Sequence, residues 1–358
     1  MTRAAVTLAV ALALAACSKP REPIADCTPV KDARPICGFH NPEDFVYLAR
    51  ANALVVSEMG AVDGSRPGQL SFFALASDTR TIAFPGAPEA RTDGWGDSKC
   101  PGPPGPAFSP HGVDLGTRAD GKLELLVVNH GGRESIEWFE VTDSPGAPAL
   151  AWRGCALSPE GALLNDVAAL PGGGFVTTKF LSKSHPVWSS LVALLRISNL
   201  PVYEWQPATG FRELPGTKMP MPNGITVSRD GETLYVNAYM ADEVRKISRA
   251  TGELLGTAAV ASPDNLNWSP DGQLLVASHN APMNEMLACG EIEKGQCPFH
   301  FSIVRLDPET MKGVAVYENA GPPMGAGTSA LRIGDELVIG SFAGDRLLRV
   351  TLPDWATK

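Results

Sequence analysis

From residue 43 onward the chain alternates apolar and polar residues in short runs, which Gly, Pro, Asp and Asn interrupt at roughly regular spacing. Residues two positions apart share one face of a strand, so such runs predict half-buried β-strands. The clearest examples are 45–49, 53–57, 69–75, 123–129, 135–141, 175–178, 233–238, 273–277, 302–306 and 336–340. The pattern predicts an all-β fold.

Two segments repeat a strand, a turn and a second strand. Residues 227–236 and 268–276 each place Asp-Gly between two apolar runs, and Asp-Gly is a favoured hairpin turn. Weaker copies occur at 171–177 and 117–127. Imperfect repeats of this kind favour a β-propeller over a β-sandwich.

Four predicted strand starts carry carboxylate or amide oxygens, and at three of them two such side chains are adjacent. Neighbouring side chains in a strand point to opposite faces, so each pair can serve two places. Carboxylate, amide and backbone oxygens are the ligands of Ca²⁺, which takes ~6–8 of them. Strand starts that are far apart in the sequence can converge only where they meet on an axis. The four starts therefore predict metal ions in the central channel of a propeller. The alternative is that these residues form ordinary turns, in which Asn and Asp are common. The pairs are Glu43-Asp44, Asn165-Asp166, Asn223-Gly224 and Asp264-Asn265.

The N-terminus has the features of an export signal. An apolar run follows Arg3 and is too short to span a membrane as a helix. Its end, Leu-Ala-Ala before Cys17, resembles the bacterial lipoprotein box, in which the cysteine carries the lipid. We therefore expect a signal peptide at 1–16, a lipid-anchored tether at 17–36 and one propeller domain at 37–358. A secretory signal with an incidental cysteine is the alternative. An Asp directly after the lipidated cysteine would favour retention in the inner membrane. The chain has Ser18 at this position, so we expect the protein in the outer membrane of a bacterial cell envelope.

The other cysteines form an even set, which in an exported chain predicts disulfides. Closeness in sequence suggests Cys27 with Cys37 and Cys289 with Cys297, which leaves Cys100 with Cys155. No Cys-x-x-Cys or Cys/His spacing indicates zinc. The formal charge of −9 argues against nucleic acid as a partner.

Two regions depart from the strand pattern. Residues 84–108 are rich in Pro and Gly and predict a long loop held by a disulfide. Residues 180–200 have the only convincing helical pattern. This segment could cover the channel mouth, touch lipid or cap the core.

Seven short motifs, in order over residues 41–350, resemble the serum paraoxonase and arylesterase family. The related senescence-marker-protein and gluconolactonase family shares the six-bladed propeller and metal channel, but His-Gly with Val-Val-Asn-His points to the paraoxonase side. The motifs are Pro42-Glu43-Asp44, Ser109-Pro110-His111-Gly112-Val113, Val127-Val128-Asn129-His130, Asn165-Asp166-Val167, Pro222-Asn223-Gly224-Ile225, Asp264-Asn265 and Ser278-His279-Asn280.

This resemblance implies a six-bladed propeller with two calcium ions, one catalytic and one structural. The lower, structural ion would take Asp44, Asp166 and the backbone carbonyl of Val113. The upper, catalytic ion would take Glu43, Asn165, Asn223, Asp264 and Asn265.

His111 and His130 match the histidine dyad of the family. His111 would activate water, and His130 would orient it or relay its proton. The alternative is that both are buried structural histidines bonded to backbone carbonyls. Met221 and His279 fall where the family has its substrate pocket. Met221 replaces an aromatic residue.

Other departures leave the substrate range and the lid open. Thr177-Thr178-Lys179 stands where the family has Asn-Asp-His, and the last cysteine is Cys297, so the bridge between the chain termini of the animal enzymes is absent. The resemblance implies a calcium-dependent hydrolase of small lactones or aryl esters. No Gly-x-Ser-x-Gly or His-Glu-x-x-His motif supports a serine or zinc mechanism. A sugar lactonase and a non-catalytic calcium-stabilised lipoprotein that binds an envelope partner are the alternatives.

Overall fold

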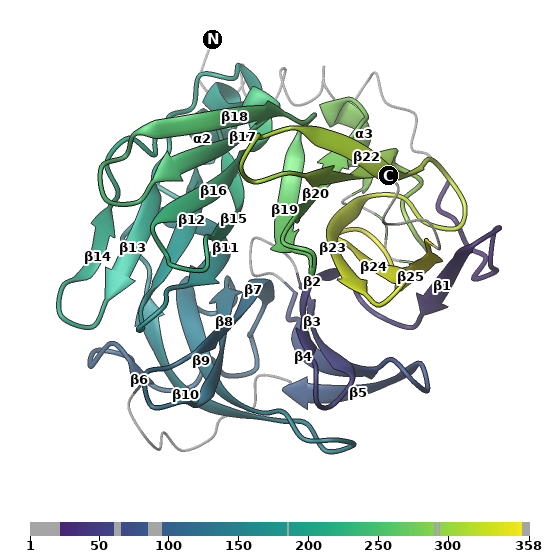
Figure 1. Cartoon of the computed structure of the whole chain (residues 1–358), viewed down its shortest axis with the longest axis horizontal. Coiled ribbons are helices and arrows are strands. Elements are labelled where there is room, and N and C mark those ends of the chain that lie inside the picture. Colours follow the sequence, from purple (N-terminus) through teal and green to yellow (C-terminus); the bar gives the residue numbers. More distant parts are fainter. Residues whose placement is uncertain are drawn as a thin grey trace, which may run out of the picture.

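The computed structural model describes residues 22–60, 66–84, 95–184, 186–289, 292 and 294–352. Within these residues six antiparallel sheets of four or five strands surround one axis (Figure 1), which confirms the predicted six-bladed β-propeller. The predicted signal peptide at 1–16 and Cys17 lie outside the described residues.

The strands of the first three blades run from the channel outward in chain order, except for one short outer strand of the second blade. The first contains β2 (Pro42–Leu48), β3 (Ala53–Glu58), β4 (Gln69–Ala74) and β5 (Thr79–Phe84). The second contains β7 (Pro110–Thr117), β8 (Leu123–Asn129), β9 (Ser135–Thr142), β10 (Ala149–Leu157) and the short parallel strand β6 (Trp95–Gly96). The third contains β11 (Ala162–Ala169), β12 (Phe175–Ser182), β13 (Val202–Gln206) and β14 (Gly210–Glu213).

The fourth and fifth blades each contain four consecutive strands, whereas the sixth joins both ends of the described chain. The fourth contains β15 (Pro222–Val227), β16 (Thr233–Ala238), β17 (Glu243–Ser248) and β18 (Leu254–Ala259). The fifth contains β19 (Pro263–Trp268), β20 (Leu274–His279), β21 (Phe301–Leu306) and β22 (Gly313–Asn319). The sixth contains β23 (Gly327–Ile333), β24 (Glu336–Ser341), β25 (Arg346–Thr351) and β1 (Ala33–Cys37).

Both predicted Asp-Gly hairpins form, as β15–β16 and β19–β20. In the first, Asp230 accepts a hydrogen bond from the Glu232 amide at 3.0 Å, and Gly231 has φ +74°. Most residues avoid this left-handed conformation, whereas Gly adopts it without a steric penalty. The turn chemistry therefore sets the register of these blades.

Apolar side chains fill the spaces between neighbouring blades. Phe84 from the first blade packs edge to face on Phe139 from the second, with ring centroids 4.9 Å apart, and Phe108 joins them. Equivalent clusters fill the other blade interfaces. Because both faces of each sheet are covered, the six blades form one body.

The N-terminal segment closes the ring. β1 pairs antiparallel with β25, from Ala33 opposite Val350 to Cys37 opposite Arg346, and Figure 1 shows the purple and yellow strands side by side. The fully buried Arg346 donates hydrogen bonds to the carbonyls of Ile24, Asp26 and Pro323. The folded body therefore begins before residue 37, the boundary that the sequence predicts.

All three disulfides suggested by the sequence are present. Cys27–Cys37 ties the N-terminal segment to β1, Cys289–Cys297 lies next to the fifth blade, and Cys100–Cys155 joins the loop of residues 84–108 to β10. The described part of that loop also contains β6, which pairs with β10 at Cys155.

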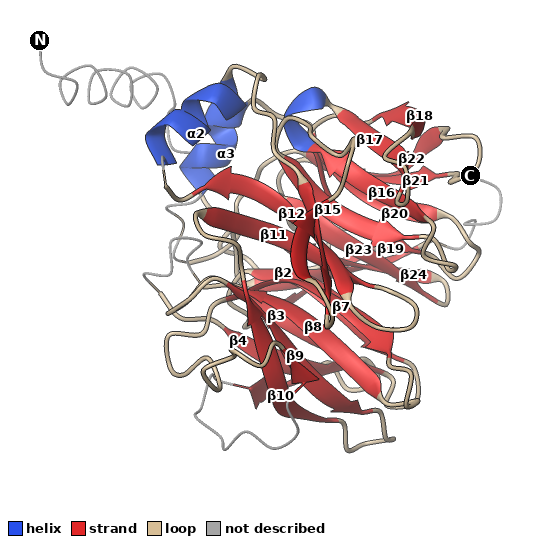
Figure 2. Cartoon of the chain, turned by 90° about the vertical axis from the view of Figure 1, so that its left-hand side faces the viewer, coloured by secondary structure: helices blue, strands red, loops and turns tan. Residues whose placement is uncertain are grey.

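Two helices cover one end of the strands. α2 (Pro186–Leu194) confirms the helix predicted within 180–200, and α3 (Met283–Cys289) was not expected. Figure 2 shows both at the same end of the molecule, where Ala193 and Met286 belong to one apolar cluster with Met221 and Tyr239. None of the described helices has the length and apolar character to cross a membrane.

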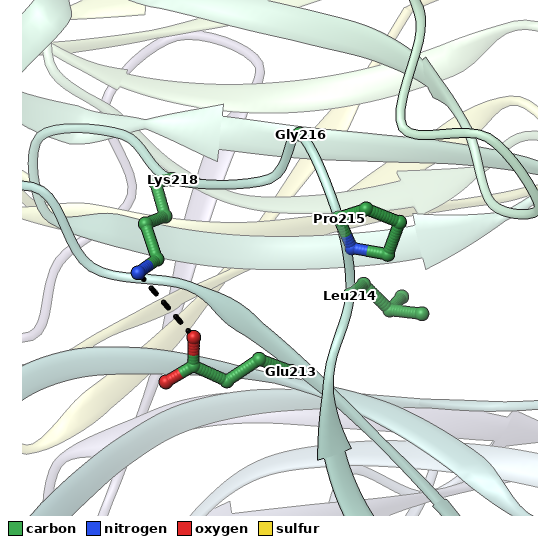
Figure 3. A pocket seen from close by; sticks show the side chains of 5 residues that line it. All are labelled: Glu213, Leu214, Pro215, Gly216 and Lys218. Carbon is green, nitrogen blue, oxygen red and sulfur yellow. Dashed lines mark ion pairs between the residues drawn. The ribbon is translucent and has the colours of Figure 1, made fainter.

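A surface hollow of about 410 Å³ lies on the rim of the third blade, between β14 and the loop that leads to β15 (Figure 3). Glu213 and Lys218 form an ion pair of 3.4 Å across it. Both side chains are about half exposed, so this pair contributes little to stability. The hollow borders β14, the outermost strand of its blade, whereas the polar pairs are on the innermost strands.

Replacing Arg346 by Met should lower the free energy of unfolding by on the order of 3 kcal/mol, because three backbone carbonyls lose a buried cationic donor. Lys218→Ala, which removes an exposed charge, should change it by less than about 0.5 kcal/mol. Urea unfolding monitored by circular dichroism measures both. Equal midpoints for Arg346→Met and the parent would show that this arginine does not hold the closure.

Candidate functional site

The innermost strand of every blade is irregular at the same place. In five of them two consecutive residues stand opposite one residue of the next strand, and in β2 one residue, Glu43, is inserted. Such β-bulges turn side chains away from the regular pleat and are common beside active sites. The six bulges ring the channel axis and carry Glu43-Asp44, His111-Gly112, Asn165-Asp166, Asn223-Gly224, Asp264-Asn265 and Thr328-Ser329.

The structure therefore brings all the predicted side-chain ligands together. It adds the pair Thr328-Ser329, which the sequence analysis missed. Its signal was present, since two polar residues precede Ala330 at a strand start just as they do in the other blades. Thr328 donates to the Glu43 carbonyl at 2.6 Å and Ser329 donates to Asp44 Oδ1 at 2.7 Å.

Two glycines in the ring are required by close packing. A Cβ on Gly112 would lie 2.6 Å from Asp166 Cα, and one on Gly224 would lie 2.7 Å from Asn265 Cα. Neither contact is possible for real side chains. The glycines thus let adjacent bulges approach each other, which draws their ligands toward the axis.

Asp44 and Asp166 form the lower part of the site. Asp44 Oδ2 accepts from the Val113 amide at 2.9 Å, and Asp166 Oδ2 accepts from the Ile225 amide at 2.8 Å. Val113 is thus close to Asp44, as predicted, but it contacts Asp44 through its N–H. The expected role of its carbonyl stays a prediction. Asp114, one residue further along β7, adds a third carboxylate, which is half-buried and accepts from the Ala169 amide at 2.7 Å.

Four oxygens of the upper part are buried and have no hydrogen-bond donor among the described residues. Glu43 keeps one oxygen bonded to the Asn265 amide group at 2.7 Å, and its other oxygen has no donor. Leaving an acceptor buried and unbonded costs about 1–3 kcal/mol, so each one calls for an explanation. The four are Glu43 Oε2, Asn165 Oδ1, Asn223 Oδ1 and Asn265 Oδ1.

These oxygens fit a hard divalent cation. Calcium is held by carboxylate and amide oxygens, and it would satisfy acceptors that lack a proton donor. Within the described residues no group of three or more His, Cys, Asp or Glu side chains forms a metal site by itself. The upper set relies on three asparagines and only two carboxylates, Glu43 and Asp264, so its chemistry suits calcium better than zinc.

Burial sets the ionisation of the carboxylates. Burial and repulsion from Asp44 and Asp264 raise the pKa of Glu43 well above its usual value. Burial raises the pKa of Asp264 to about 7 and that of Asp44 to about 6. Burial and repulsion from Asp44 also raise the pKa of Asp166 well above its usual value. A cation would reverse these shifts, since it favours the ionised carboxylates.

The predicted histidine pair is also formed. His111 Nδ1 lies 2.8 Å from His130 Nε2, and His111 Nε2 lies 3.7 Å from Glu43 Oε1. Burial, with a smaller effect of His130, lowers the pKa of His111 well below its usual value. His111 is therefore a neutral imidazole at the edge of the candidate metal site, and the polar contacts described for its ring are with the side chains of His130 and Glu43.

The two predicted pocket residues lie on the other side of the ring. His279 Nε2 lies 3.4 Å from Asp264 Oδ2 and 3.1 Å from the Gly327 carbonyl, and its Nδ1 is 2.9 Å from the Tyr239 hydroxyl. Burial lowers the pKa of His279 to about 4. Met221 is buried in the apolar cluster with Tyr239, next to α2.

The sequence profile of the arylesterase family matches residues 66–348. The chain belongs to the arylesterase family. This membership supports a hydrolytic enzyme on a propeller scaffold. No curated protein sequence matches the chain.

Two solved structures with the same fold as this member of the arylesterase family are enzymes with other names. A gluconolactonase from Xanthomonas campestris is 16% identical with a TM-score of 0.53, and the match covers 94% of this chain and 99% of that one. A luciferin-regenerating enzyme is 13% identical with a TM-score of 0.54, covering 89% of this chain and 93% of that one. At these identities the likeness shows the propeller fold alone.

The raised carboxyl pKa values predict how pH affects the metal-free protein. Between the ordinary pKa of Asp, about 4, and the folded value of about 7 for Asp264, the folded state holds a proton that the unfolded state has lost. Stability contributed by this group therefore falls as pH rises. In chelator, the melting temperature should be lower at about pH 8 than at about pH 5, and saturating calcium should remove the difference.

Asp264→Asn removes this titrating carboxylate, and with it the repulsion that Asp264 exerts on Glu43. In chelator, the variant should lose less stability than the parent over the same pH interval. Thermal melts at several pH values measure the slope. A steeper loss in the variant than in the parent would contradict the assignment.

Proposed function

We propose that this chain is a calcium-dependent hydrolase of small lactones, aryl esters or both. Four buried oxygens that have no hydrogen-bond donor among the described residues support the proposal best. One of them belongs to Glu43, whose other carboxylate oxygen, Oε1, lies 3.7 Å from His111 Nε2. Family membership supports the hydrolytic chemistry. The oxygens supply a cation site, and the imidazole supplies a base beside it.

The proposed calcium sites follow the two levels of the ring. The lower, structural ion would be held by Asp44, Asp166 and the Val113 backbone, where the carboxylates already accept backbone hydrogen bonds. The upper, catalytic ion would be held by the side chains of Glu43, Asn165, Asn223, Asp264 and Asn265.

A calcium ion bound at the upper site would polarise the substrate carbonyl as a Lewis acid and stabilise the charge that develops on its oxygen. The chain's own residues would prepare the water. His111 Nε2 faces Glu43, and its low pKa keeps it unprotonated and able to accept a proton. His130, 2.8 Å from the other ring nitrogen, would hold the His111 ring in place.

Hydrolysis should depend on added calcium. A panel of aliphatic lactones, a sugar lactone and aryl esters, assayed in chelator and in excess calcium, is the test. We expect turnover of at least one substrate with calcium and loss of turnover in chelator, together with a lower melting temperature, because an ion bound only by the folded state stabilises it.

Two neighbouring variants provide the matched control. Asn165 Oδ1 has no donor among the residues that the structure describes, so Asn165→Ala should lower turnover with little loss of stability. Asp166 accepts the amides of Val167 and Ile225, so Asp166→Ala should mainly lower the melting temperature. Calcium binding without hydrolysis of any substrate would favour the non-catalytic propeller, and turnover of the sugar lactone alone would favour a sugar lactonase. Unchanged melting and turnover in chelator would overturn the calcium proposal.

We also propose that lipid on Cys17 anchors the protein to the bacterial cell envelope, as the lipoprotein box suggests. Cys17→Ala should move the protein from the membrane fraction to the soluble fraction without changing its kcat on a short-chain ester. Fractionation followed by immunoblotting measures this. Retention of the variant in the membrane fraction would assign the anchoring to another segment, such as α2, whose Val187 and Trp188 are exposed.

A further inference from the structure

The histidine pair continues into a third residue. His130 Nδ1 lies 3.0 Å from Glu134 Oε1 and 3.1 Å from Glu134 Oε2, so the carboxylate faces the ring nitrogen that does not contact His111. Glu134 lies in the turn between β8 and β9. Nothing in the sequence pattern marks it, since it follows Gly-Gly-Arg in a polar loop.

Other groups fix the position of this carboxylate. The Leu164 amide donates to Glu134 Oε1 at 2.7 Å, and Lys183 Nζ lies 2.7 Å from Glu134 Oε2. Leu164 immediately precedes the ligand pair of β11, and Lys183 follows β12 at the start of the segment that contains α2. Burial alone would raise the pKa of Glu134, but His130 and Lys183 outweigh it and hold the pKa below its usual value.

An ionised carboxylate accepts hydrogen bonds and cannot donate them. His130 must therefore carry a proton on Nδ1, and in its neutral form Nε2 is left with a lone pair. Since His130 Nε2 and His111 Nδ1 are 2.8 Å apart, one of these nitrogens must donate, and only His111 can do so. Neutral His111 then has no proton on Nε2, the nitrogen that faces Glu43.

We infer that Glu134 is a positioning residue, which fixes the tautomers of His130 and His111 so that the bare His111 Nε2 points into the channel. Without this carboxylate the two rings could adopt the opposite arrangement, with a proton on His111 Nε2 and no base at the site. When His111 Nε2 accepts the proton of a water molecule, its Nδ1–H stays bonded to His130, and the negative charge of Glu134 stabilises the new imidazolium. This inference rests on the proposed function only for its kinetic consequence.

Glu134→Gln tests the inference. The glutamine has an NH₂ group in place of one carboxylate oxygen, so a donor would face either the Leu164 amide or Lys183, which are donors themselves. The NH₂ group can also donate to His130 Nδ1, so that this nitrogen no longer has to carry the proton. We expect kcat to fall by on the order of 10²-fold or more, as for tautomer-fixing carboxylates in catalytic triads, with KM changed by less than about threefold. Glu134→Asp keeps the charge and should recover part of the lost kcat.

Glu140→Gln is the matched control. Glu140 is on β9 of the same blade and pairs with Lys122 and Arg153 instead of a histidine. The Glu140→Gln variant also loses a carboxylate, but this carboxylate has no described contact with the histidine pair. Its kcat should therefore stay within about twofold of the parent. Comparable losses in Glu140→Gln and Glu134→Gln would indicate a general structural effect and would overturn the inference.

Histidine side-chain nitrogen–proton correlation NMR gives a readout that needs no substrate. With only six histidines in the chain, the His111 and His130 signals can be assigned from His111→Gln and His130→Gln. The parent should show both rings protonated on Nδ1, and Glu134→Gln should lose this pattern. The opposite tautomers in the parent, or unchanged tautomers in Glu134→Gln, would overturn the inference.

The kinetic results separate this inference from the proposed function. If His111→Gln loses activity while Glu134→Gln keeps it, the role of Glu134 is wrong and the hydrolase remains. If the parent hydrolyses no ester or lactone with calcium, the proposed function fails. The NMR spectra would then still decide whether Glu134 sets the tautomers.

Discussion

The structure depends on one electrostatic constraint, which is the crowding of acceptor oxygens inside the channel. Glu43, Asp44, Asp166 and Asp264 are all buried, and the hydrogen bonds described for them come from backbone amides and from the side chains of Ser329, Asn223 and Asn265 rather than from Lys or Arg. Buried carboxylates without cationic partners either stay protonated or need a metal ion. The buried carboxylates thus cost stability in the absence of metal, and the same carboxylates make a cation site. A channel lined by apolar residues would be more stable but could not bind calcium.

Closure of the propeller makes this crowding possible. The ring draws residues from Glu43 to Ser329, and no single blade contains a complete ligand set. The pairing of β1 with β25 holds the first and sixth blades together, so that Ser329 reaches Asp44 across the junction at 2.7 Å. Arg346 and the Cys27–Cys37 disulfide then fix the N-terminal segment against that junction. Stability far from the channel therefore determines whether the ligands stay together, because the repulsion among them acts to open the ring.

Local patterns in the sequence predicted the features that local chemistry determines. Strands, Asp-Gly hairpins and the polar pairs all follow from residues close together in the chain, and so did α2. The strand β1 was assigned to the tether because its partner, β25, lies about 300 residues away and no local pattern reveals that pairing. Glu134 was missed for the same reason, since its contacts with Leu164 and Lys183 come from the next blade. The short helix α3 has only seven residues, too few for a helical period to be recognised.

The channel end of the molecule has two chemically different surfaces. The bulges supply unpaired oxygens and an imidazole, while Met221, Tyr239 and Met240 pack with Ala193 of α2 into an apolar cluster beside them. An ester or lactone has the same division, with a polar carbonyl next to a hydrocarbon part. In the proposed reaction the carbonyl would face the metal ligands, and the apolar cluster would exclude water from the rest of the substrate, which strengthens electrostatic interactions at the carbonyl. Lys183 forms an ion pair with Glu134 and lies three residues before α2, so the segment that leads to this helix also contacts the carboxylate beside the histidine pair.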